Sequence, residues 1–175
     1  RQAVQELLAS AWQHRRDRMK PLPRQFVRTA RRHPRRLAMA DAQNKKITFG
    51  QALVKTVFLA RRLKQVWAGQ KMVGLLLPPS VPGALVNFAA LLAGKVPVNL
   101  NYTLSAETLA SCIRQCEIKT VVTSKAFLEK LKLTVPCETA LLEDVAAKPA
   151  FGEKLTAFLM AWLLPVGLLE RALGR

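Results

Sequence analysis

The feature that most constrains the fold is a regular alternation of buried-strand and amphipathic-helix patterns between Ile47 and Thr123. Met72–Leu77 is apolar on both faces, which a central parallel strand needs when helices cover both sides of its sheet. Further strand patterns occupy Val96–Leu100 and Ile118–Thr123, and a helical pattern precedes each of them. Strands that alternate with helices through short connections predict the α/β class, with part of a doubly wound parallel sheet flanked by helices.

Capping signals mark where the helices of this alternation begin. Thr48-Phe-Gly-Gln51 fits a capping box and predicts a helix that runs to about Trp67. The following helices have serine caps, at Ser80, Ser105 and Ser124. Pro97 lacks the N–H that a sheet ladder uses, so its strand is expected at a sheet edge or paired only beyond Pro97. The expected core includes Leu53, Val57, Leu75, Phe88, Leu109 and Ile113.

The two ends of the chain differ from this central part. Residues 1–20 show an amphipathic helical pattern, and the prolines at 21 and 23 end it. A short helix at 24–32 and a strand at Leu37–Ala42 follow, and Lys46–Phe49 is expected to pair back on that strand as a hairpin. We therefore predict a basic helical linker at 1–23, an α/β domain at 24–148 and an amphipathic C-terminal helix at 149–175.

Positive charge is the unusual feature of the composition. The chain has a formal net charge of +17, and its first 36 residues carry eleven basic residues against two acids. Such an excess favours an anionic partner or surface. One interpretation is a non-enzymatic basic module that binds nucleic acid or an acidic protein through Arg15–Arg36. Nucleic acid is the weaker choice, because the segment has neither zinc-ligand spacing nor a helix-turn-helix pattern.

The chain shows no motif of catalysis or phosphate binding. Its eight glycines fit no phosphate-binding loop, and Thr123-Ser124-Lys125 is better interpreted as a strand end with a helix cap. Cys112 and Cys116 have metal-ligand spacing but no nearby third or fourth ligand, so we interpret them as core thiols. His14 and Asp17 belong to a solvated helix face. We assign no catalytic, cofactor-binding or metal-binding residue.

The three cysteines give no disulfide framework, which favours a reducing compartment. The first residues form no secretory signal, because Arg1–Lys20 never contains a long enough apolar run. Since the sequence starts at Arg1 without Met, we expect it to be part of a longer protein.

The C-terminal stretch from Leu155 to Leu169 has an apolar helical face. Its uncharged part, Ala157–Leu169, has 13 residues, whereas a span of the bilayer needs roughly 20. The helix could lie in a membrane interface, or it could pack on its own domain or on another one. The candidate contacts with a membrane or another anionic partner are Arg28, Arg31, Arg32, Lys154, Phe158, Trp162 and Arg171.

Several short blocks in order resemble the N-terminal portion of the adenylate-forming acyl-CoA and acyl-carrier-protein synthetases. The resemblance covers about Gln25 to Leu164 and includes Asn101-Tyr-Thr103, Glu117-Ile-Lys-Thr120 and Leu142-Glu-Asp144. It is strongest to the synthetase half of the bacterial bifunctional 2-acylglycerophosphoethanolamine acyltransferase/acyl-carrier-protein synthetases. The longer blocks are Ile47–Leu53, Val73–Ser80, Ala90–Thr103 and Ile118–Ser124.

This resemblance implies a parent enzyme that uses ATP and magnesium to activate a fatty acid as an acyl-adenylate. The acyl group would pass to the thiol of acyl carrier protein or CoA, in the recycling of phospholipid acyl chains. The family's phosphate loop and catalytic lysine would lie beyond Arg175, so the chain alone is expected to be inactive. The resemblance places the parent in the bacterial cytoplasm, peripherally on the inner membrane, with an acyltransferase possible upstream.

Overall fold

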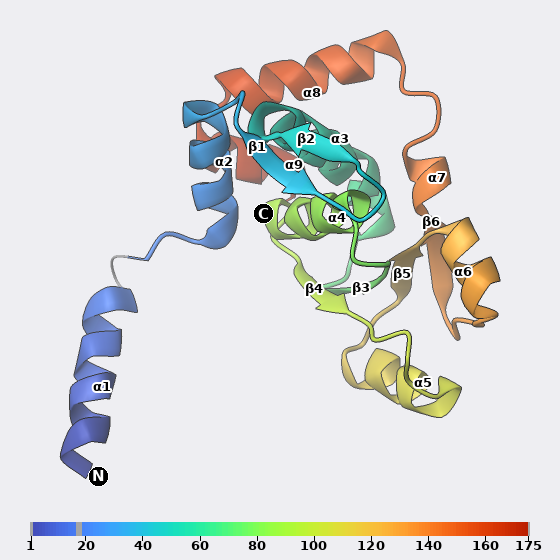
Figure 1. The fold of residues 1–175 in the computed structure, drawn as a ribbon, viewed down its shortest axis with the longest axis horizontal. Helices are drawn as coiled ribbons and strands as arrows, with labels where there is room; N and C mark the ends of the chain where they lie inside the picture. Colours follow the sequence, from blue (N-terminus) through green and yellow to red (C-terminus); the bar gives the residue numbers. More distant parts are fainter. Residues whose placement is uncertain (1, 17–18, 175) are drawn as a thin grey trace.

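The computed structural model describes residues 2–16 and 19–174, and their main feature is a parallel sheet with helices on both faces (Figure 1). The main sheet has the strand order β4-β3-β5-β6, with β3 at Met72–Leu76, β4 at Val96–Asn99, β5 at Thr120–Thr123 and β6 at Glu138–Leu141. All neighbouring strands are parallel, and Leu75 lies between Asn99 of β4 and Val122 of β5. The parallel pairing predicted for β3, β4 and β5 is confirmed.

The position of each strand follows from its side chains. In β3, Val73, Leu75 and Leu76 are almost completely buried, as expected for a strand with neighbours on both sides. β4 forms one edge of the sheet and pairs with β3 from Val96 onward, so the first of the two positions expected for this strand is confirmed and the second is not. β6 was not predicted from the sequence, because its Glu-Thr-Ala-Leu segment has no apolar run and half of its residues are exposed.

A helix precedes or follows each strand of the main sheet. The long helix α3, Phe49–Val66, begins at the predicted capping box, in which Thr48 and Gln51 exchange hydrogen bonds. Serine caps begin the three helices predicted to have them: Ser80 caps α4, Val81–Leu92, Ser105 caps α5, Ala106–Gln115, and Ser124 caps α6, Lys125–Leu131. The short helix α7, Leu142–Val145, follows β6 directly.

The sheet separates two apolar clusters. One contains Val73, Leu75 and Val122 together with the buried faces of α3 and α4. The other contains Leu76 and Val121 with residues of α5, including Leu109 and Ile113. Of the predicted core residues, all except Phe88 are buried, and Phe88 is half-buried with its ring stacked on Phe26 at 4.2 Å between centroids. Cys112 and Cys116 are half-buried thiols that pack against the second cluster.

The elements that precede α3 in the chain differ in how they pack on the domain. Helix α1, Gln2–Arg16, stands apart from the rest in Figure 1, whereas α2, Leu22–Arg32, packs on α3 and α4. The expected hairpin forms from β1, Leu37–Ala40, and β2, Lys46–Thr48, which pair antiparallel. The prediction for His14 and Asp17 lies outside the described residues, since the His14 side chain and all of Asp17 are not described.

The C-terminal segment differs from the single amphipathic helix that its pattern predicted. It forms two helices, α8 at Phe151–Leu163 and α9 at Val166–Leu173. Pro165 separates them, because proline restricts Leu164 to an extended conformation and cannot donate the next helical hydrogen bond. The prediction of a single C-terminal helix at 149–175 is therefore wrong. Within the described ranges, no helix has both the length and the apolar character needed to cross a bilayer.

Candidate functional site

The carboxyl ends of the parallel strands form the first candidate region. Open α/β sheets bind their ligands in the crevice beyond this edge. Here the edge carries Asn99, the last residue of β4, together with Ser80 and Ser124, which follow β3 and β5 in the chain. Thr123, at the end of β5, donates from Oγ1 to the Leu76 carbonyl at 2.8 Å and so fastens two strands at this edge.

Two asparagines at the edge hold one another in a fixed orientation. Asn87 Nδ2 donates to Asn99 Oδ1 at 3.0 Å, and Asn99 Nδ2 donates back to Asn87 Oδ1 at 2.9 Å. Asn87 also donates to the Gly83 carbonyl, which joins the pair to the first turn of α4. This pair was not predicted from the sequence, because no sequence motif joins a helix residue to a strand residue twelve positions later.

Carboxylates of the chain itself occupy two helix N-termini near this edge. Asp41 Oδ2 accepts from the Val81 N–H at the start of α4, at 3.2 Å, and this bond lowers the pKa of Asp41. Glu143 accepts from the Lys125 N–H at the start of α6. Burial alone would raise the pKa of Glu143, but hydrogen bonds from its own backbone N–H, from the Lys125 N–H and from the Ser124 hydroxyl outweigh burial and lower it. At the starts of α4 and α6, one backbone N–H that could bind a phosphate is therefore already bonded to a carboxylate of the chain.

The same region confirms the interpretation of Thr123-Ser124-Lys125 as a strand end and helix cap. Thr123 ends β5, and Ser124 Oγ accepts from the Phe127 N–H at 3.3 Å. In the described part of the chain, no group of three or more His, Cys, Asp or Glu side chains is placed to hold a metal ion.

The second candidate region is the surface where α2, α3, α8 and α9 meet. Arg24 of α2 makes a bidentate ion pair with the buried Glu170 carboxylate of α9, with distances of 3.0 Å from Nε to Oε1 and 2.9 Å from Nη2 to Oε2. The hydrogen bond and charge of Glu170 raise the pKa of Arg24. Arg31 donates from Nε to the Ala161 carbonyl at 2.8 Å and from Nη2 to the Leu164 carbonyl at 2.7 Å. These two arginines hold α8 and α9 against α2.

Arg31 satisfies carbonyls that the end of α8 leaves without helical partners. We expect Arg31→Met to lower the free energy of unfolding by about 1.5–3 kcal/mol, because it removes two hydrogen bonds from a charged donor to partly buried carbonyls. Urea denaturation followed by circular dichroism measures this change. The matched control is Arg28→Met on the same helix, where the side chain is exposed and should leave stability nearly unchanged. Equal effects of the two substitutions would contradict the role given to Arg31.

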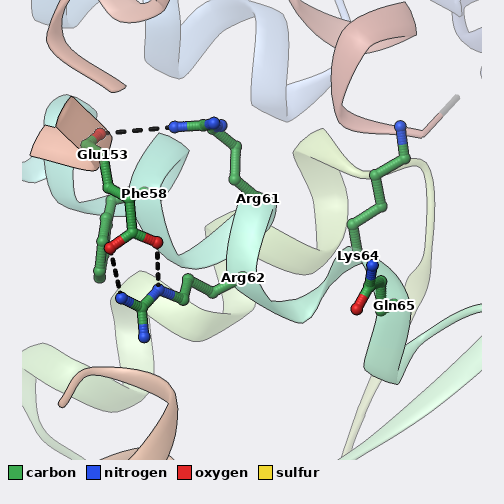
Figure 2. Close-up of a pocket in the computed structure, with 6 residues that line it drawn as sticks. All are labelled: Phe58, Arg61, Arg62, Lys64, Gln65 and Glu153. Atoms are coloured by element: carbon green, nitrogen blue, oxygen red, sulfur yellow. Dashed lines mark hydrogen bonds and ion pairs between the residues drawn. The ribbon is translucent and has the colours of Figure 1, made fainter. Parts of the chain in front are cut away.

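A cation-rich hollow lies between α3 and the start of α8 (Figure 2). Figure 2 shows the Glu153 carboxylate facing the Arg62 guanidinium, and Arg62 Nε donates to Glu153 Oε1 at 2.9 Å. Arg62 also lies over the Phe58 ring, 5.1 Å from its centroid. The hydrogen bond from Arg62 lowers the pKa of Glu153. Since Arg61 and Lys64 line the same hollow, it keeps a net positive charge.

The structure places the predicted contact residues in two different roles. Arg31 is not available for a partner, because both its bonds go to the end of α8. Arg28, Arg32, Lys154 and Arg171 are exposed. The structure brings together Phe158 and Trp162, whose ring centroids are 6.2 Å apart, and both line an apolar cavity of about 320 Å³ beside Gly50 and Lys55 of α3.

The kind of protein to which this sheet belongs follows from a family match over most of the chain. Residues 26–158 match the model of the AMP-binding enzymes. The chain belongs to the AMP-binding enzyme family. The match runs from α2 into α8, so α1, the last residues of α8 and all of α9 lie outside the part that the family model describes.

Solved AMP-binding enzymes and their relatives share the fold. The O-succinylbenzoate coenzyme A synthetase MenE from Bacillus subtilis, in complex with AMP, superposes with a TM-score of 0.63 at 19% identity over 75% of this chain and 34% of that one. MenE has also been solved with ATP and a magnesium ion. The N-terminal domain of FACL13 from Mycobacterium tuberculosis gives a TM-score of 0.62 at 20% identity over 73% of this chain and 35% of that one. The N-terminal subdomain of NpsA from Klebsiella oxytoca, in complex with 3-hydroxyanthranilyl-AMSN, gives a TM-score of 0.63 at 16% identity over 73% of this chain and 32% of that one.

This AMP-binding enzyme chain spans about a third of the length of the structures it matches. The identities are low, so these structures show a shared fold. The predicted α/β class and parallel sheet are confirmed, with the sheet in the position of the N-terminal subdomain. The finer resemblance to the bifunctional acyltransferase/synthetases stays a prediction.

Proposed function

We propose that this chain is the N-terminal α/β part of an ATP-dependent ligase that activates a fatty acid and transfers it to the thiol of acyl carrier protein or CoA. The family match over residues 26–158 carries the proposal, because it assigns the chain to adenylate-forming chemistry. The fatty acid and the carrier thiol rest on the sequence blocks such as Asn101-Tyr-Thr103. We place the parent enzyme in the bacterial cytoplasm, with a role in recycling phospholipid acyl chains.

The described residues do not themselves fit ATP or magnesium. The starts of α4 and α6 are bonded to the Asp41 and Glu143 carboxylates, which would repel a phosphate placed there. No cluster of metal-ligating side chains forms in the described part of the chain. We therefore assign the nucleotide and the metal ion to no residue of this chain. Its contribution is the sheet framework and the polar edge held by Asn87 and Asn99.

The non-enzymatic alternative, a basic module for nucleic acid or an acidic protein, is not favoured. Family membership accounts for residues 26–158 as enzyme fold, and this range includes half of the Arg15–Arg36 segment to which that alternative assigned binding. Two arginines of the segment, Arg24 and Arg31, are also engaged within the domain.

Exchange of labelled pyrophosphate into ATP tests the proposal directly. We expect the longer protein that contains this sequence to catalyse the exchange with long-chain fatty acids, and the 175-residue chain alone to catalyse none. Benzoate and O-succinylbenzoate serve as control acids. Exchange with the aromatic acids alone would overturn the fatty acid assignment, and exchange by the isolated chain would overturn the inference that the reacting groups lie elsewhere.

A second measurement separates the acceptor thiols. Mass spectrometry of the products should detect the acyl group on acyl carrier protein or on CoA when both are supplied with ATP and fatty acid. A stable acyl-adenylate with neither thiol acylated would overturn the transfer step while leaving the activation step intact.

A further inference from the structure

Helix α8 has two apolar faces, and only one of them packs on the domain. Ala157 and Ala161 are completely buried on the inner face, where α8 lies along α3. On the outer face, Phe151 is 80% exposed and Leu163 is 71% exposed. We call the outer apolar side chains the α8 stripe, which consists of Phe151, Leu155, Phe158, Leu159 and Leu163. Their spacing along the sequence places them on one side of the helix.

An apolar hollow extends the α8 stripe toward α3. Phe158 and Trp162 of α8 line it together with Gly50 and Val54 of α3, and its volume is about 320 Å³. Packed protein contains few voids larger than a water molecule, so a hollow of this size has room for further side chains. Figure 1 shows α8 along the outer border of the domain. A continuous apolar row beside such a hollow marks an interaction surface, whereas single exposed apolar side chains do not.

The charges of α8 argue against a lipid surface as the occupant. A helix that lies in a membrane interface is rich in Lys and Arg on its polar face. Among the 13 residues of α8, Lys154 is the one basic residue and Glu153 the one acidic residue. A single lysine gives little attraction to anionic headgroups, because each basic residue contributes only a small increment.

A second copy of this chain also fits the surface poorly. In a two-fold dimer, the same patch of each copy contacts the other. Lys154 is exposed one helical turn before Phe158, and Lys55 lies at the hollow. Glu153, the acid of α8, is already paired with Arg62. A dimer through the stripe would therefore bring lysines of both copies together, and like charges oppose association.

The rest of the enzyme is the occupant that the comparisons favour. This chain matches about a third of each solved structure, including those described as the N-terminal domain of FACL13 and the N-terminal subdomain of NpsA. About two-thirds of each of those domains thus has no counterpart in this chain. Elements of one domain pack around shared apolar surface, so an outward apolar face is expected where further elements of the domain attach.

We propose that the α8 stripe and the adjoining hollow form the contact surface for the remaining part of the same AMP-binding enzyme domain. The contacting segment presents apolar side chains to the stripe, a bulky apolar side chain to the hollow and a carboxylate to Lys154. Burial of the stripe on both sides turns α8 from a surface helix into a helix of the domain core. The inference rests on the proposed function, because it requires the chain to be the N-terminal part of a longer ligase.

Hydroxyl-radical footprinting with mass spectrometry tests the proposal without any substitution. The oxidation rate of each side chain is compared between the folded protein and the protein in urea. We expect Phe151 and Leu163 to lose most of their reactivity in the folded longer protein, and to keep it in the 175-residue chain alone. Leu53 and Trp67 are the reference residues, because both are completely buried and should be protected in both proteins.

A pair of substitutions measures what the contact contributes. Phe151→Ser with Leu163→Ser should lower the melting temperature of the longer protein by about 3 °C or more, because burial of two apolar side chains is lost. The same pair should leave the melting temperature of the 175-residue chain nearly unchanged, because both side chains are exposed there. The matched control is Leu8→Ser with Trp12→Ser on α1, which stands apart from the domain and should leave both proteins unchanged.

Three results would overturn the proposal. The first is oxidation of Phe151 and Leu163 in the longer protein as fast as in the chain alone. The second is protection that appears only after anionic vesicles are added, which would assign the stripe to a lipid surface. The third is protection in the chain alone that rises with its concentration, which would make the stripe a contact between copies. Footprinting needs no ATP, so a longer protein with a protected stripe but no ligase activity would contradict the proposed function alone.

Discussion

Replacing Leu75 with aspartate is expected to unfold the chain. Leu75 is 1% exposed and lies in the middle of β3, between Asn99 of β4 and Val122 of β5. Its side chain belongs to the larger apolar cluster, where a carboxylate would have neither water nor a cation. Burial of an unpaired charge costs several kcal/mol, which is a large share of the roughly 5–15 kcal/mol that stabilises a domain.

Thermal unfolding followed by circular dichroism measures this effect. The matched control is Val96→Asp, which makes a similar change on the edge strand β4, where the side chain is 43% exposed. The control should lose about 1 kcal/mol or less, because water still solvates the new carboxylate. A soluble Leu75→Asp variant with an unchanged melting temperature would show that β3 is not the covered central strand.

The central part of the fold was predictable because its signals are local. A strand buried on both faces must be apolar throughout, and Met72–Leu76 meets that requirement. Helix starts need side-chain acceptors, and Thr48, Ser80, Ser105 and Ser124 provide them. β6 could not be predicted in the same way, since it forms an exposed edge and gains its order from pairing with β5.

The candidate site was less predictable because its contacts join distant parts of the chain. Arg24 and Glu170 are 146 positions apart, and Arg31 lies 130 positions before Ala161. A run of arginines looks the same in sequence whether its members face solvent or bind carbonyls. One signal was available: Pro165 ends α8 early, which leaves carbonyls near Leu164 that need a donor from elsewhere.

The sequence pattern also could not predict which face of α8 packs on the domain. Its apolar face was evident in the sequence, but that face could have packed inward or remained exposed. The outcome depends on Ala157 and Ala161, whose small side chains let α8 lie close to α3 and leave the larger side chains outside. Only the packing of the folded chain shows which face the helix turns to the domain.

A second large effect is expected from Gly74→Val, also in β3. A Cβ atom at Gly74 would lie 2.7 Å from Cγ2 of Val121 and 3.0 Å from Cγ2 of Ile118. Both neighbours are buried in the smaller apolar cluster, so neither can move into solvent. We expect a loss of about 1–3 kcal/mol or more from overpacking, measured by urea denaturation. Gly167→Val is the control, because nothing lies within 4 Å of a Cβ at that position of α9.

A double-mutant cycle identifies the cause of that loss. Gly74→Ala introduces the same Cβ with less bulk, and Val121→Ala removes the methyl group that it would meet. If the close approach to Val121 causes the loss, the double variant should be less destabilised than the sum of the two single variants. Strict additivity would show that Gly74 is required for another reason, such as the approach of Ile118 from the same side of the sheet.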